Sequence, residues 1–99
     1  FKERRNFVVD SLNNIKGISC LSPEGAFYVF PNCKKLLNKK TKLKTDKDFV
    51  EKLLEKAEVA VVQGSAFGLD GYFRISYATS MENLKKAMQR IKTFCDSLN

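Results

Sequence analysis

Residues 64–80, GSAFGLDGYFRISYATS, are the stretch around which the rest of this chain is expected to fold. The segment begins as a glycine-rich loop and continues as a strand-like run, YFRISY. Side chains alternate between the two faces of a strand, so Phe73, Ile75 and Tyr77 share one face, which suits a hydrophobic core. Arg74 then lies on the opposite face, near the loop. A guanidinium presents a planar fork of donors that suits a carboxylate or a phosphate, although an arginine on a solvated strand face is the more ordinary case.

Three segments carry apolar residues at helical intervals and are predicted to be helices. The first covers residues 1 to about 15 and stops near Gly17, because glycine accepts the left-handed conformation that ends many helices. The second follows the capping-box pattern TDKD at residues 45–48. The third follows a second capping-box pattern, Thr79-x-x-Glu82, and continues to the end of the chain.

Four short segments are rich in aromatic, β-branched or other apolar residues and are predicted to be strands. The first two are joined by the turn signal SPEG at residues 22–25, which predicts a hairpin, and the third is an apolar run that predicts a fully buried strand. The order α-β-β-α-β-β-α predicts an α/β (α+β-like) sandwich with a small mixed sheet of about four strands packed with three helices. The four strand segments are residues 18–21, 26–30, 59–62 and 72–77.

The composition predicts one globular domain with a basic surface. The chain has 99 residues, 43% of them hydrophobic, and a formal net charge of +7. No apolar run has the length of a membrane span. Six lysines fall within residues 34–44, a segment without an acidic residue. This segment could contact nucleic acid or an acidic surface, but a solvated loop is the preferred interpretation because no aromatic residues are interleaved with the lysines.

The residue types exclude most self-contained catalytic sites. Histidine is absent, which removes Ser-His and Cys-His nucleophile pairs, and the widely spaced Cys20, Cys33 and Cys95 do not form a zinc-binding pattern. Free thiols in a reducing, cytoplasmic setting are expected instead. The chain also begins at Phe1, directly in an amphipathic pattern without a capping residue, which predicts that it is a piece of a longer protein. Any chemistry is therefore expected to depend on residues outside this chain.

Three motifs together indicate a family. They are SPEGAFYVFPN at residues 22–32, EVAVVQGSAFG at residues 58–68 and GYFRISYATS at residues 71–80. In this order they closely resemble the C-terminal small domain of the fold-type I pyridoxal-phosphate aminotransferases, specifically the class I/II aspartate aminotransferase group. The segments RRNFVVDSLNNIKGISC and ENLKKAMQRIKTFCDSL resemble the flanking helices of that domain, so the resemblance covers essentially the whole chain.

The resemblance implies that residues 1–99 form the small domain of an aminotransferase whose large domain lies elsewhere in the same chain. Pyridoxal 5'-phosphate and its Schiff-base lysine belong to that large domain, so the resemblance implies no catalytic, cofactor-binding or metal-binding residue here, and none among the lysines of residues 34–44. It also implies a cytoplasmic homodimer that acts on amino-acid and 2-oxo-acid substrates, without membrane binding.

The arginine of the F-R-I-S-Y-A motif carries over as Arg74, which the resemblance implies binds the substrate α-carboxylate. A bidentate arginine would orient the substrate for cleavage of its Cα–H bond while the cofactor serves as electron sink. Phe27 and Tyr28 are weaker candidates for contacts with the substrate side chain, since hydrophobic strand residues more often belong to the core. Gln63 stands where the family usually has proline, which leaves open how stiff the following loop is. That loop, residues 64–67, is a candidate for the mouth of the site.

The expected activity is the conversion of aspartate and 2-oxoglutarate to oxaloacetate and glutamate by the full-length enzyme, with the isolated chain inactive. One alternative is an aromatic-amino-acid or prephenate aminotransferase, or a lyase on the same fold. A different class of alternative is a basic α/β module that binds nucleic acid, which would show a salt-dependent affinity.

Overall fold

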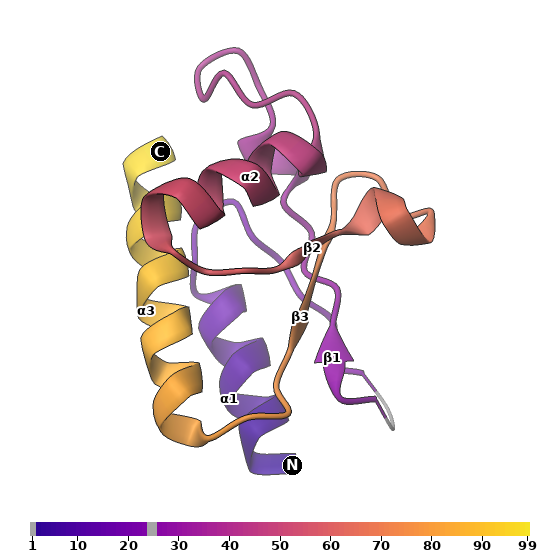
Figure 1. Ribbon diagram of the computed structural model, residues 1–99, viewed down its shortest axis with the longest axis vertical. Helices are drawn as coiled ribbons and strands as arrows, with labels where there is room; N and C mark the ends of the chain where they lie inside the picture. The colour runs from indigo at the N-terminus through magenta and orange to yellow at the C-terminus, as the bar shows by residue number, and fades with distance from the viewer. Residues whose placement is uncertain (1, 24–25) are drawn as a thin grey trace.

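The computed structural model describes residues 2–23 and 26–99, and in it the helices and a small sheet lie on opposite sides of the molecule (Figure 1). The fold class predicted from the sequence is confirmed, with three α-helices and one sheet in the described residues. The elements are α1 (Lys2–Asn13), β1 (Tyr28–Val29), the 3-10 turn η1 (Lys34–Leu36), α2 (Asp46–Ala57), β2 (Val62–Gln63), the 3-10 turn η2 (Gly64–Phe67), β3 (Phe73–Ser76) and α3 (Met81–Leu98).

Helices α1 and α3 lie side by side and run in the same direction, and α2 packs across the C-terminal part of α3 (Figure 1). The buried residues of α1 are Val8, Val9 and Leu12, which follow the helical spacing of the sequence. The helix ends at Asn13, earlier than the predicted end near residue 15, and Gly17, with a φ of 95°, lies in the turn that follows and does not cap the helix. Phe1, which was included in the predicted helix, lies outside the described residues.

Helix α2 begins with the predicted capping box. The Thr45 hydroxyl accepts a hydrogen bond from the Asp48 amide at 3.2 Å, and the Asp48 carboxylate accepts one from the Thr45 amide at 3.3 Å. Two backbone donors that helix geometry would leave unpaired are satisfied in this way. The TDKD pattern therefore placed this helix start correctly.

The predicted cap of α3 was wrong by one residue. Ser80, not Thr79, is the N-cap, and its hydroxyl accepts from the Asn83 amide at 3.2 Å. Because the helix begins at Met81, Glu82 is only its second residue and cannot complete a capping box, which needs the third. The Thr79 hydroxyl instead accepts from the Asn83 side chain at 3.2 Å.

The sheet has three strands in the order β1-β3-β2, and both pairings are antiparallel. About four strands in a mixed sheet were expected. The missing strand is residues 18–21, which form only an isolated bridge between Ser19 and Asn32. The side chain of Asn13 explains this, since it accepts from the Cys20 amide and donates to the Cys20 carbonyl, each at 2.8 Å. A side chain therefore takes the backbone groups that a strand would use, while the turn proposed at residues 22–25 falls partly outside the described residues.

The apolar run at residues 59–62 is not a fully buried strand, contrary to the prediction. Val59 is buried, but Ala60 and Val62 are exposed, and β2 begins only at Val62. The physical reason is position, because β2 is an edge strand that pairs with β3 on one side. An edge strand of a small sheet cannot be enclosed on both faces as a central strand of a larger sheet can.

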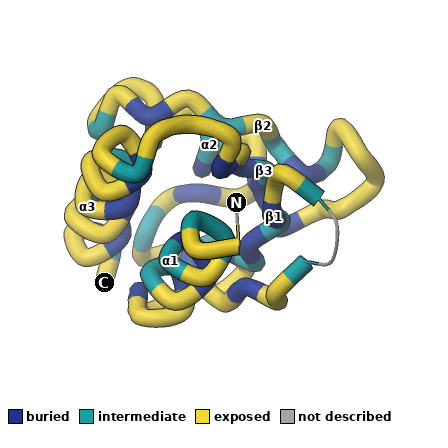
Figure 2. Tube along the Cα trace, turned by 90° about the horizontal axis from the view of Figure 1, so that it is seen from below, coloured by how far each residue is buried: buried dark blue, intermediate teal, exposed yellow. Residues whose placement is uncertain are grey.

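The core lies between the helices and the inner face of the sheet (Figure 2). Phe49 of α2 contacts Phe73 of β3 and Phe94 of α3, with ring centroids 5.2 and 5.6 Å apart. Phe73, Ile75 and Tyr77 are all buried, which confirms the alternation predicted for this strand. The central strand therefore presents its other face, which carries Arg74, away from the core.

The lysine-rich segment forms the predicted loop, and this loop contains the 3-10 turn η1. Leu36 and Leu43 anchor this loop in the core, whereas its six lysines are exposed. Among the described residues, no helix combines the length and the apolar character that crossing a membrane requires.

Candidate functional site

Arg74 lies half-buried in the middle strand of the sheet, between two aromatic rings. Its guanidinium carbon is 5.1 Å from the centroid of Tyr28 and 4.7 Å from the centroid of Phe67. Tyr28 belongs to β1 and Phe67 to η2, so three separate parts of the chain meet at this side chain. Cation–π contacts of this kind contribute about 0.5–1 kcal/mol each and limit the directions in which a flexible arginine can point.

Phe30 connects the two rings that contact Arg74. Its ring makes edge contacts with both Tyr28 and Phe67, with centroids 5.7 Å apart in each case. We call Tyr28, Phe30, Phe67 and Arg74 the arginine face. Tyr28 is 41% exposed and Phe67 is 47% exposed. Large aromatic side chains gathered on an open surface around a cation are typical of a binding site.

The guanidinium has no acidic partner in residues 2–23 and 26–99. The ion pairs of this part of the chain join lysines to carboxylates on α2 and α3, and none includes Arg74. Neutral rings leave its N–H donors without a charged acceptor. The arrangement therefore suits an anionic group with two acceptors, such as a carboxylate.

Of the three site residues predicted from the sequence, the structure brings Tyr28 to Arg74 and not Phe27. Phe27 comes just before β1, so its side chain is expected on the opposite face of the sheet from Tyr28. The Phe27 ring is 54% exposed, and its backbone carbonyl accepts from the Tyr77 amide at 2.9 Å and the Ser76 hydroxyl at 3.3 Å. Phe27 thus helps to connect the end of β1 to β3.

Phe67 is carried by a closed loop at residues 64–72. The Gly64 amide donates to the Tyr72 carbonyl at 2.7 Å, and the Leu69 amide donates to the Gly64 carbonyl at 2.9 Å. A side chain at Gly64 would place its Cβ only 2.3 Å from the Leu69 carbonyl oxygen, so this position requires glycine. The sequence indicated a loop near the site, but the contact between Phe67 and Arg74 was not predicted.

Gln63 takes part in the organisation of this loop. Its side-chain nitrogen donates to the Ser65 hydroxyl at 3.1 Å. In the family that this chain resembles, proline is usual at this position. Here the glutamine side chain instead makes a hydrogen bond to the second residue of the loop.

Asp46 is a buried carboxylate that sequence reasoning missed. It is 3% exposed at the first turn of α2, and it accepts from the Ser65 amide at 2.8 Å and the Gly71 amide at 3.3 Å. Burial alone would raise the pKa of Asp46, but the hydrogen bonds from Ser65 and Gly71 favour the charged form more strongly and lower its pKa below the usual value. In the sequence, Asp46 was only the second residue of the TDKD pattern, and no signal linked it to the loop.

The three cysteines are free and buried. Burial raises the pKa of Cys20 to about 11 and, together with nearby charged groups, raises those of Cys33 and Cys95 to about 12. The thiols are therefore protonated at neutral pH and unsuited to nucleophilic chemistry. Among the described residues, no cluster of cysteines and carboxylates could hold a metal ion.

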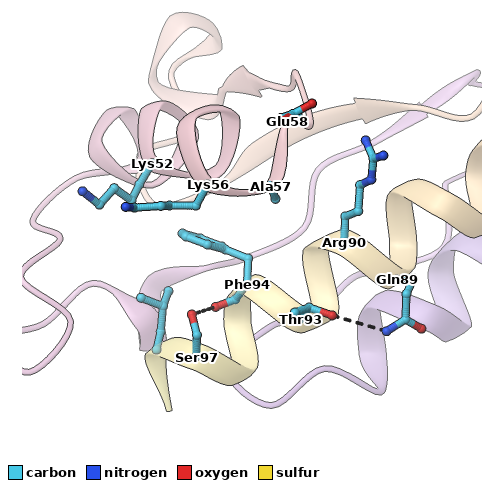
Figure 3. A pocket seen from close by; sticks show the side chains of 10 residues that line it. Lys52, Lys56, Ala57, Glu58, Gln89, Arg90, Thr93, Phe94 and Ser97 are labelled. Carbon is cyan, nitrogen blue, oxygen red and sulfur yellow. Dashed lines mark hydrogen bonds between the residues drawn. The ribbon is translucent and has the colours of Figure 1, made fainter.

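A groove of about 570 Å³ lies between the ends of α2 and α3, away from the arginine face (Figure 3). Charged and polar side chains surround Phe94 there, and some of them have partners. Lys52 lies 3.8 Å from Glu55, and the Gln89 side chain donates to the Thr93 hydroxyl at 3.3 Å. Because the charged and polar side chains that line it are exposed, the groove is a weaker candidate than the arginine face.

The comparisons with known proteins point to one family. The family model described as Aminotransferase class I and II matches residues 1–91. A probable aspartate/prephenate aminotransferase of Rhizobium leguminosarum bv. phaseoli is 57% identical over 99 residues, covering 96% of this chain and 25% of the relative.

Solved structures agree with this result. An aspartate aminotransferase from Rhizobium meliloti has a TM-score of 0.92 and 55% identity, covering 96% of this chain and 25% of that chain. An alanine aminotransferase from Pyrococcus furiosus has a TM-score of 0.88 and 40% identity, covering 97% and 24%. The chain thus spans about a quarter of the length of the proteins that it matches. It belongs to the class I and II aminotransferase family.

Proposed function

We propose that this chain is the C-terminal small domain of a pyridoxal-phosphate aminotransferase, in which Arg74 binds the α-carboxylate of the substrate. The observation that carries the proposal is the half-buried guanidinium between Tyr28 and Phe67, without an acidic partner in the described part of the chain. The family itself supports the reaction class, because relatives named as aminotransferases align with nearly the whole chain.

Arg74 would act by orientation rather than by proton transfer. A guanidinium can donate two parallel hydrogen bonds to a carboxylate, which fixes both the position and the rotation of the substrate. The flanking rings exclude water from part of the cation, and this strengthens its attraction for an anion. An amino acid and a 2-oxo acid both carry this carboxylate, so one arginine serves both substrates of a transamination.

Aspartate with 2-oxoglutarate is our first choice of substrates, and prephenate or an aromatic amino acid is the alternative. Relatives bear the names aspartate/prephenate, aspartate and alanine aminotransferase, whose amino-acid substrates share the α-carboxylate and differ in the side chain. Arg74 would bind the α-carboxylate that these substrates share. Tyr28 would form one wall of the site beside it, and Phe27, which precedes the strand, is a weaker candidate.

The family implies pyridoxal phosphate, but the residues of this chain do not fit that cofactor. A Schiff-base lysine is normally desolvated, whereas every lysine in the described residues is exposed. We therefore propose that a large domain of the same protein holds the cofactor, in a homodimer. The buried free thiols favour a reducing compartment, and we propose the cytoplasm.

The test is the kinetics of the full-length protein with aspartate and 2-oxoglutarate. Arg74→Ala should lower kcat/KM by about a hundredfold or more, chiefly by raising KM, because the substrate carboxylate loses its charged hydrogen-bond donor. The absorption spectrum of the bound cofactor should be unchanged. Arg90→Ala, which removes the same charge from the exposed side of α3, is the matched control and should behave like the wild type. Wild-type kinetics for Arg74→Ala would refute the carboxylate role.

A further inference from the structure

We propose that Asp46 is a positioning residue, which holds the loop at residues 64–72 so that Phe67 lies against Arg74 in the orientation that binds the substrate. The inference rests on the proposed function of Arg74 and extends it to a residue that does not touch the substrate. Four observations lead from the carboxylate to the guanidinium.

The first observation is that Asp46 is a charged group in a place that normally excludes charge. Among the described residues it is the one buried charged side chain, at 3% exposed. Burying a carboxylate is costly unless hydrogen bonds compensate for the lost water. The compensation here comes from the loop and not from a lysine or an arginine, so the carboxylate and the loop are mutually dependent.

The second observation is the position of the two loop amides to which the Asp46 carboxylate is hydrogen-bonded. One oxygen accepts from the Ser65 amide at 2.8 Å and the other from the Gly71 amide at 3.3 Å. These partners are 19 and 25 residues away in the sequence, and they stand near the two ends of the loop. Two-point attachment by one side chain fixes the loop against the first turn of α2.

The third observation is that Phe67 lies between the two attachment points. The loop is also closed within itself, since the Tyr72 amide donates to the Leu69 carbonyl and the Gly68 amide to the Ser65 carbonyl, each at 3.2 Å. It therefore moves as a unit. A shift at its base would carry Phe67 with it.

The fourth observation is that Phe67 is in direct contact with the functional group. Its centroid is 4.7 Å from the Arg74 guanidinium carbon, closer than Tyr28 at 5.1 Å. Phe67 is otherwise supported on the arginine face by Phe30, with centroids 5.7 Å apart. Loss of the Asp46 attachment would leave the Cys33 amide, which donates to the Gly71 carbonyl at 2.9 Å, as the hydrogen bond to the second end of the loop, and Phe67 itself would be supported by the contact with Phe30.

A purely structural role for Asp46 at the start of α2 is the competing explanation, because an acidic residue there also interacts favourably with the helix dipole. The neighbouring Asp48 separates the two explanations. It caps the same helix through the Lys44 and Thr45 amides, at 3.0 and 3.3 Å, and these bonds do not involve the loop. Asp48→Ala therefore weakens the helix start and leaves the loop attachment intact.

The experiment compares Asp46→Ala, Asp46→Asn and Asp48→Ala in the full-length aminotransferase, each with and without Arg74→Ala. The readouts are KM and kcat for aspartate, the melting temperature, and hydrogen exchange of a peptide that spans residues 63–72. Asp46→Ala should lower kcat/KM by about tenfold or more, mainly by raising KM, because even a small displacement of a group that orients the substrate weakens productive binding. Asp46→Asn keeps one acceptor oxygen and should fall between Asp46→Ala and the wild type.

Three further results are expected. Exchange in residues 63–72 should be faster in Asp46→Ala and unchanged in Asp48→Ala. Asp48→Ala should lower the melting temperature while KM stays within about twofold of the wild type, because only global stability is affected. With Arg74 already replaced, Asp46→Ala should cause no further loss of kcat/KM, as expected for two residues that act as one unit.

An unchanged KM in folded Asp46→Ala or Asp46→Asn would overturn the proposal. So would a loss of kcat/KM that is as large without Arg74 as with it, because Asp46 would then act through another group. A failure of the proposed function has a different signature, namely Arg74→Ala with wild-type kinetics. If Asp46→Ala does not fold, Asp46→Asn decides the question by the same readouts.

Discussion

The helical side and the arginine face of this chain are stabilised in different ways. On the helical side, Phe49, Phe73 and Phe94 pack together with aliphatic residues of α1 and α3, and many contacts share the stabilisation. On the arginine face, the loop at residues 64–72 is held by a few hydrogen bonds, two of them to Asp46. Exposed rings then complete the face.

This difference shows how a domain of this size can have a stable fold and also hold its binding residues in a defined position. Apolar packing depends on volume and tolerates replacement by residues of similar size. The position of a loop that is held by individual hydrogen bonds depends on the exact residues that make them, because no neighbour can replace a missing amide or carboxylate. The helical side therefore keeps the chain folded, and the arginine face positions Phe67 against Arg74.

The largest effect on stability is expected at Phe49, which is fully buried. Phe49→Ala should lower the free energy of unfolding by about 3–5 kcal/mol, because it leaves a cavity between α2, β3 and α3. Phe49→Leu, which keeps most of the volume, should cost less than about 1.5 kcal/mol. Urea denaturation followed by circular dichroism measures both values. Equal losses from the two variants would contradict a core that depends on volume.

A smaller but more local effect is expected at Gly64. Gly64→Ala should cost about 2 kcal/mol, since the added Cβ meets the backbone oxygens of the loop and these cannot move without opening it. Gly68 is the matched control: its φ is 77°, and the space around an added Cβ is free, so Gly68→Ala should cost only about 1 kcal/mol for the left-handed backbone. If Gly68→Ala proved the more damaging change, the crowding at Gly64 would not be what fixes the loop.

The smallest of the three effects is expected from Asp46→Asn, and it depends on pH. At neutral pH the variant should lose about 1.5 kcal/mol of stability, because the hydrogen bonds lose their charged acceptor. The pKa of Asp46 is lowered in the folded protein, so its contribution is present above the unfolded pKa, about 3.9, and is lost as the pH falls through the folded pKa.

The difference in stability between wild type and Asp46→Asn should therefore begin to shrink at about pH 4, where the carboxylate of the unfolded chain takes up a proton, and should vanish below the lower pKa of the folded protein. Urea midpoints measured across this range test the expectation, and Asp48→Asn shows how much of it is common to carboxylates at this helix start. A difference that grew on acidification would mean that Asp46 is uncharged in the folded chain.

Much of the fold was predictable because local rules determine it. Helical spacing placed all three helices, the TDKD pattern located the start of α2, and strand alternation separated Phe73 and Ile75 from Arg74. The position of Arg74 on the face away from the core followed from the same alternation. These features depend on residues close together in the sequence, so the sequence alone contains them.

Besides the N-cap of α3, which was wrong by one residue, the errors arose where groups outside a segment compete for its backbone atoms or for its space. Residues 18–21 have a strand-like composition, yet Asn13 bonds to both backbone groups of Cys20. The run at residues 59–62 is apolar throughout, yet its place at the sheet edge leaves Val62 exposed. No pattern within either segment indicates these partners, because they lie outside the segment.

The sequence by itself determined the three helices, the inward face of the central strand and the arginine on its other side, because periodicity and capping act within a few residues. Only the tertiary structure decided what surrounds that arginine. Tyr28, Phe67 and Asp46 come from three separate elements. Their contacts depend on how β1, the loop at residues 64–72 and α2 pack together, which is a balance of packing and buried hydrogen bonds that no local pattern encodes.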